Sequence, residues 1–129
     1  FPYTTLFRSR MEPCWMALGQ AAGIAASLAI DRKVPVQDVD ISRLQDLLVD
    51  QKATLIYFRD LRPEDPNFRL AQYMGLRGYL PEWNANLHGA IDEGTLQEWS
   101  ALCGFKPKAI LGKTSRLEVL TMIYKRIRQ

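Results

Sequence analysis

The sequence has very few of the residues that build metal centres and disulfide frameworks. It holds two cysteines, Cys14 and Cys103, and one histidine, His88. The cysteines lie far apart in different predicted units, and a single histidine cannot complete a metal site. We therefore expect no structural disulfide and no metal centre. His88 is expected on an exposed loop.

An excess of charge of one sign is also missing. The chain has 17 basic and 14 acidic residues, which gives a formal net charge of +3. The one local concentration of basic residues, Lys125-Arg126-x-Arg128, suits the C-terminal end of a helix, where cations interact favourably with the helix dipole. Such a balance does not indicate a nucleic-acid partner.

The motifs of a self-contained catalytic site are absent too. No Gly-x-Gly-x-x-Gly follows a predicted strand, and no histidine base accompanies a serine or cysteine nucleophile. The acidic pairs Asp46/Asp50 and Asp92/Glu93 fit solvated helix faces and helix caps better than acid–base catalysis. The sequence therefore predicts no catalytic residue in this chain.

The sequence has one long hydrophobic run, but it is shorter than a typical membrane span. Residues 14–30 are mostly apolar and contain Gly19-x-x-x-Gly23, a spacing that also suits pairs of membrane helices. The run is shorter than the roughly 20 residues that a membrane span requires. It also includes Gln20 and Ser27 and takes much of its apolar character from alanine. This composition favours a buried helix of a soluble protein, without a membrane span.

The most informative segment that is present covers residues 10–32. Pro13 suits the first turn of a helix, where its missing N–H is no loss. One face of this helix would be almost free of side chains, because it consists of Gly19, Ala22, Gly23, Ala26 and Ser27. Such a face can lie close to another backbone or to a flat ligand. The helix N-terminus can hold an anionic group.

With its Met-x-Leu-Gly-Gln-Ala-Ala-Gly pattern, this segment closely resembles the last cofactor-contacting helix of bacterial FAD-dependent oxidoreductases. The resemblance implies that the chain is the C-terminal portion of such an enzyme, inactive alone, with FAD bound mainly by sequence outside it. The implied cofactor-binding residues are Met11, Glu12, Pro13, Cys14, Trp15, Met16 and Gly19. The alternative is that the same helix face only packs on a sheet and contacts no cofactor.

The first nine residues, Phe-Pro-Tyr-Thr-Thr-Leu-Phe-Arg-Ser, resemble the read-through translation of a common sequencing-library adapter. We therefore expect residues 1–9 to be non-native and the native reading frame to resume at Arg10. The alternative is a genuine extended arm with aromatic anchors.

The predicted fold class is mostly α, a small fragment of about five helices without the parent's α/β dinucleotide-binding domain. A second helix is expected from a cap at Asp40, or at Ser42 in a capping box with Gln45, to about Gln51. Residues 53–58 are predicted to be an extended connector or edge strand, and residues 59–67 a loop. Three further helices are expected: one from Phe68 ended by Gly78, one over 94–103 ended by Gly104, and one opened by Ser115-x-x-Glu118.

The predicted organisation is the adapter-like segment 1–9, the FAD-domain helices 10–56 and a helical unit 57–129. The last unit is similar to an S-layer homology module in Phe58-x-Asp60-Leu61 and in Ser115-Arg116-Leu117-Glu118, which matches that family's Thr-Arg-Ala-Glu. Pro81-Glu82-Trp83 replaces the family's glycine-rich loop. The similarity implies a small helical fold and, as an alternative function, binding of a cell-wall polymer or another protein. We expect this unit to be a helical buttress of the enzyme.

Overall fold

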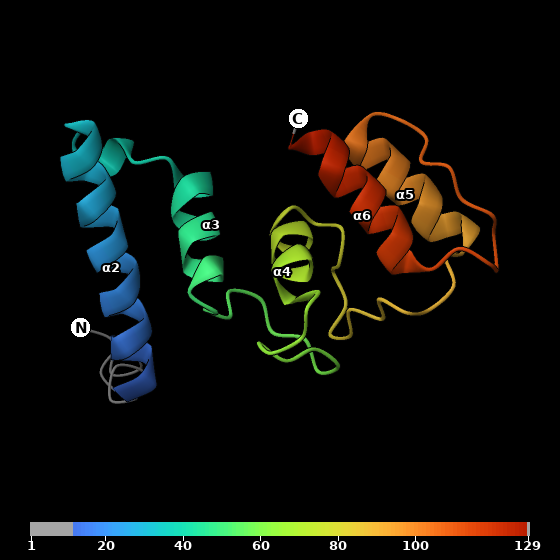
Figure 1. Ribbon diagram of the computed structural model, residues 1–129, viewed down its shortest axis with the longest axis horizontal. Helices are drawn as coiled ribbons and strands as arrows, with labels where there is room; N and C mark the ends of the chain where they lie inside the picture. Colours follow the sequence, from blue (N-terminus) through green and yellow to red (C-terminus); the bar gives the residue numbers. More distant parts are fainter. Residues whose placement is uncertain (1–11, 129) are drawn as a thin grey trace, which may run out of the picture. The chain divides into compact units, whose positions relative to one another are not determined.

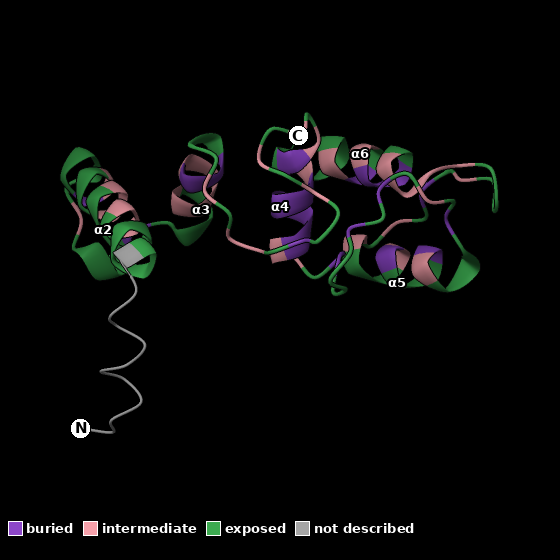
Figure 2. Cartoon of the chain, turned by 90° about the horizontal axis from the view of Figure 1, so that it is seen from below, coloured by how far each residue is buried: buried purple, intermediate pink, exposed green. Residues whose placement is uncertain are grey.

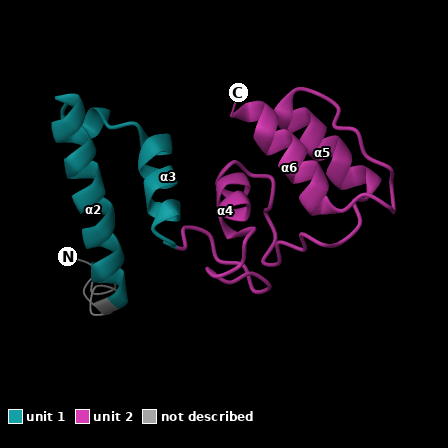
Figure 3. Ribbon diagram, viewed as in Figure 1, with its two compact units in different colours: residues 1–53 teal, residues 54–129 magenta. Residues whose placement is uncertain are grey.

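A computed structural model describes residues 12–128, so Met11 and the adapter-like segment lie outside the described residues. The described part forms five α-helices and one short 3-10 helix (Figure 1). It contains no strand, only an isolated antiparallel bridge between Ala90 and Ser115. The predicted mostly α fold class is confirmed. The chain divides into two units, residues 1–53 and 54–129, which are described separately below (Figure 3).

The first unit contains α2 (Glu12–Arg32), η1 (Val36–Asp38) and α3 (Ile41–Asp50), with α2 and α3 in contact. The Asp40 carboxylate accepts a hydrogen bond of 3.1 Å from the N–H of Arg43 and so caps α3. Of the two caps predicted from the sequence, Asp40 is therefore the one formed. The capping box of Ser42 with Gln45 is wrong, because Ser42 already lies inside the helix.

The second unit contains α4 (Phe68–Leu76), α5 (Glu93–Cys103) and α6 (Arg116–Ile127), and α4 contacts α6. Gly78 ends α4 in the left-handed conformation, with φ of +84°. The N–H groups of Gly78 and Tyr79 return to the carbonyls of Gly75 and Met74, the double hydrogen bond of a Schellman motif. Gly104 ends α5 with φ of +73°. Both predicted glycine stops are confirmed.

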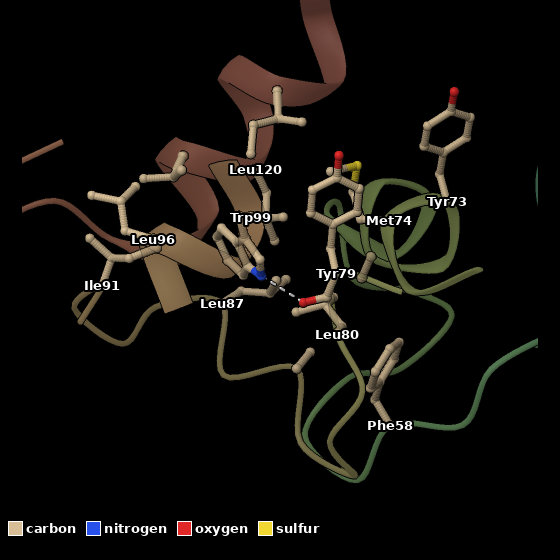
Figure 4. Packing of buried hydrophobic residues seen from close by; sticks show 14 residues of the cluster. Phe58, Tyr73, Met74, Tyr79, Leu80, Leu87, Ile91, Leu96, Trp99 and Leu120 are labelled. Carbon is tan, nitrogen blue, oxygen red and sulfur yellow. Dashed lines mark hydrogen bonds between the residues drawn. The ribbon is translucent and has the colours of Figure 1, made fainter. Parts of the chain in front are cut away.

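The core of the second unit is built around Trp99, which is 1% exposed. Its indole N–H donates a 2.8 Å hydrogen bond to the carbonyl of Tyr79, and the two rings meet edge to face (Figure 4). Val119, Leu120 and Ile123 of α6 are fully buried in the same cluster. This unit therefore has a hydrophobic core of its own.

Residues 53–58 form neither helix nor strand and bend at Leu55 and Ile56, which confirms a connector and excludes the edge strand. The connector is held by Gln72 of α4, whose side chain is completely buried. The Gln72 amide oxygen accepts from the N–H groups of Leu55 and Ile56, each at 2.9 Å, and its NH₂ donates to the carbonyl of Ile56 at 2.7 Å.

Candidate functional site

The described residues predicted to contact a cofactor all lie in the first turns of α2. Glu12 to Met16 open the helix, Pro13 stands at its second position, and Gly19 follows one turn later. Pro13 and Cys14 are exposed, and the side chains of Trp15 and Met16 are 56% and 75% exposed. The side chains of the first turns of α2, from Pro13 to Met16, are therefore exposed on this unit.

The small-residue face of α2 is uncovered. A Cβ built on Gly19 or on Gly23 would meet no atom within 4 Å. Leu18 and Ile30 are also mostly exposed, and Ala29 is the one buried residue of α2 from Pro13 onward (Figure 2). In this chain α2 is not buried, since the described residues provide only α3 and η1 to cover it, and its burial against a sheet of the parent enzyme stays a prediction.

The length of α2 also corrects the argument on membrane spanning. The helix runs to Arg32, beyond the apolar residues 14–30, and residues 13–32 are long and apolar enough, by length and composition alone, to cross a membrane. The core helix of a soluble protein and a signal sequence satisfy the same criterion.

Comparison with known proteins gives a result for this unit. Residues 9–48 match the family model described as FAD dependent oxidoreductase. The match spans α2, η1 and most of α3, and so it includes the predicted tail helix. No curated protein and no solved structure matches the chain.

The features of α2 fit the FAD that this family uses. An open helix N-terminus favours negative charge, as on a phosphate or a reduced flavin. A face that lacks side chains at Gly19 and Gly23 permits the close approach of a flat ring or a second backbone.

The second unit carries a polar groove of about 740 Å³ that the sequence did not predict. It is lined by Arg59, Asp60, Glu82, Trp83, Asn84, Asn86 and Arg116. Trp83 is 65% exposed, and the Arg59 guanidinium lies 5.6 Å from the centre of its ring. The signals in the sequence were Pro81-Glu82-Trp83, which puts a large aromatic side chain in a loop, and the S-layer-homology-like motifs that contain Asp60 and Arg116.

Two side chains fix the shape of this groove. The Asp60 carboxylate accepts hydrogen bonds of 2.7 Å from the N–H groups of Ala85 and Asn86. These two bonds hold the loop that contains Ala85 and Asn86. The Arg116 guanidinium stacks 5.2 Å from the centre of the Trp99 ring. Its Nε is buried without a hydrogen-bond partner among the described residues. A buried N–H donor of this kind is costly unless a ligand or water satisfies it.

Two other polar residues considered in the sequence, Asp92 and His88, lie outside this groove. Asp92 caps α5, and its carboxylate accepts from the hydroxyl of Thr95 at 2.6 Å and from the N–H of Thr95 at 2.9 Å. These hydrogen bonds, the hydroxyl first, lower the pKa of Asp92 below its ordinary value. His88 is exposed, as predicted. Residues 12–128 contain no group of three potential metal ligands.

Proposed function

We propose that this chain is a portion of an FAD-dependent oxidoreductase in which the N-terminal turn of α2 lies against the flavin. The observation that carries the proposal is the match of residues 9–48 to the FAD dependent oxidoreductase family, because it covers the helix predicted to contact the flavin. The contact residues are those predicted from the sequence, Met11 to Met16 and Gly19.

The helix acts on the flavin through its dipole. When bound, FAD supplies hydride acceptance, and the reduced ring carries negative charge near N1 and the C2 carbonyl. A helix N-terminus directed at that position stabilises the charge and favours reduction. The backbone N–H groups of the first turn provide this stabilisation, except that of Pro13, which has none.

Residues 54–129 act in this proposal as a buttress. The unit has its own core around Trp99 and holds its connector through Gln72, so it can fold against a neighbouring domain without supplying catalytic groups. Turnover by the isolated chain is not expected, because the proposal places most of the FAD-binding residues in sequence outside it.

The proposal is tested in the full-length parent by Gly19→Leu and Gly23→Leu. Either side chain would push α2 away from its neighbour, at a cost of about 1–3 kcal/mol for overpacking. The ratio of flavin to protein absorbance should fall. Ala17→Leu is the matched control, since Ala17 is exposed and lies on the opposite side of the helix. Flavin content unchanged in both glycine variants would refute close packing by this face.

A second candidate function, binding of a cell-wall polymer, is favoured by the groove in the second unit. An exposed Trp83 offers a surface for a sugar ring, and the buried Nε of Arg116 lacks a partner within the described chain. The groove contains the arginine and aspartate of the S-layer-homology-like motifs, Arg116 and Asp60.

Co-sedimentation of the chain with purified cell walls separates the two roles. A buttress should remain in the supernatant, which is the result that we expect from a single unit of this kind. A wall-binding module should sediment, and Arg116→Ala and Trp83→Ala should each release it. Lys125→Ala, which changes an exposed charge outside the groove, should not. Circular dichroism checks that the Arg116 variant stays folded.

A further inference from the structure

The connection between α5 and α6 turns a regular set of side chains toward solvent. Phe105 and Ala109 pack against the core, and Pro107 between them is buried. The residues that alternate with them, Lys106, Lys108 and Ile110, are exposed. In an extended segment alternate side chains point to opposite sides, so these three project from the same side. Figure 1 shows this connection running along α5 to the start of α6.

The turn that follows is held by hydrogen bonds, although its side chains are apolar. The hydroxyl of Thr114 accepts from the N–H of Ile110 at 2.8 Å, and the Thr114 N–H donates to the Ile110 carbonyl at 2.9 Å. Gly112 takes φ of +73° in the turn. Ile110 remains 65% exposed and Leu111 49% exposed. An ordered turn that displays two large aliphatic side chains is costly in water and favours contact with another apolar phase.

The charge around this apolar turn is of one sign. Lys106, Lys108 and Lys113 flank it, and the segment 105–114 contains no acidic residue. None of the three lysines forms an ion pair with any residue in the described range. Glu93 of α5 lines one hollow together with Lys106 and Leu111. An open hollow of about 570 Å³ beside Lys106 and Lys108 has room for an anionic headgroup.

We propose that segment 105–114 docks on an anionic phospholipid surface, with Ile110 and Leu111 entering the acyl boundary and the three lysines contacting headgroups. Lysines whose stems follow an apolar surface while their ammonium groups stay in water suit a membrane interface. A protein partner fits this segment less well. Lysine is depleted in protein–protein interfaces, and two aliphatic side chains are too few to form the hydrophobic core of a stable interface. The proposal is independent of the flavin-binding role of α2.

The test uses the whole chain with an environment-sensitive fluorophore on the turn. Leu111→Cys is labelled in a Cys14→Ser/Cys103→Ser background and titrated with phosphatidylglycerol–phosphatidylcholine vesicles or with pure phosphatidylcholine vesicles. The label reports the turn itself, so contact of the exposed α2 with lipid does not contribute. A label at Ala101→Cys, exposed on α5, is the matched control. Circular dichroism checks that each variant is folded.

We expect a blue shift at position 111 with the anionic vesicles only, and no shift at position 101. Each lysine changed to glutamine should weaken the anionic binding about fivefold. Ile110→Asn should weaken it by at least about tenfold. No shift at position 111, or an equal shift with neutral vesicles, would overturn the proposal. So would a shift caused by polyglutamate in the absence of lipid, which would indicate an acidic protein partner instead.

Discussion

At the scale of single residues, Gln72 determines how the first segment of the second unit is held. Its amide is completely buried and makes three hydrogen bonds to the backbone of Leu55 and Ile56. Those backbone groups belong to no helix or strand and would otherwise lack a protein partner. The buried Gln72 side chain therefore supplies the hydrogen bonds that a neighbouring strand would otherwise make to this backbone.

Gln72→Leu should therefore destabilise the second unit. The new side chain has a similar size, but it leaves two backbone donors and one acceptor without their partner. Each unsatisfied buried group costs about 1–3 kcal/mol, less where water reaches it. Urea denaturation followed by tryptophan fluorescence measures the loss. The control is Gln97→Leu, since Gln97 is exposed. Equal stability of the two variants would contradict this role of Gln72.

Nothing in the sequence distinguished Gln72 from an ordinary polar residue of a helix face. Its partners are 16 and 17 positions earlier in the chain, and no local pattern links them. Hydrogen bonds within four residues were easier to predict. The Ser115–Glu118 capping box was predicted from its spacing, because both partners lie in the same turn.

At the scale of elements, helix ends explain most of the agreement between sequence and structure. Three helices are capped in the same way: a side-chain oxygen accepts a hydrogen bond from the backbone N–H three residues later. The capping residues are Asp40, Asp92 and Ser115. Gly78 and Gly104 adopt the left-handed conformation that ends a helix. These interactions depend on a few neighbouring residues, so the sequence could indicate them without knowledge of the tertiary fold.

The cap of α6 gives a prediction at this scale. In the capping box the Ser115 hydroxyl accepts from the N–H of Glu118 at 3.2 Å, and the Glu118 carboxylate accepts from the N–H of Ser115 at 2.9 Å. Ser115→Ala should lower the free energy of unfolding by about 0.5–2 kcal/mol. Flavin content and turnover of the parent should be unchanged if the unit is a buttress. Thermal denaturation measures the first effect, and loss of flavin would contradict the second expectation.

At the scale of the whole molecule, the two units differ in how well they cover their apolar residues. The second unit buries a continuous cluster around Trp99. The first unit leaves Trp15, Met16, Leu18 and Ile30 of α2 mostly exposed. Exposed apolar surface of this extent is typical of an element that another domain or another molecule covers.

The isolated chain should therefore associate through α2. Burial of a large apolar side chain contributes about 1.5–3 kcal/mol, so a few such contacts drive self-association. Light scattering should show a particle mass that rises with protein concentration. Met16→Lys combined with Ile30→Lys should reduce the mass, whereas Leu102→Lys, at an exposed position of the second unit, should not. A monomer that is stable at all concentrations would contradict the fragment hypothesis.

The sequence by itself determined the helical class, the helix ends and the resemblance of residues 10–32 to a flavin-contacting helix, since these depend on local spacing and residue type. Only the tertiary structure decided which helix faces are covered. It left Gly19 and Gly23 open, buried Gln72, and brought Asp60, Trp83 and Arg116 to one groove. The physical reason is that burial and long-range hydrogen bonds depend on partners far away in the chain, and no local pattern encodes those partners.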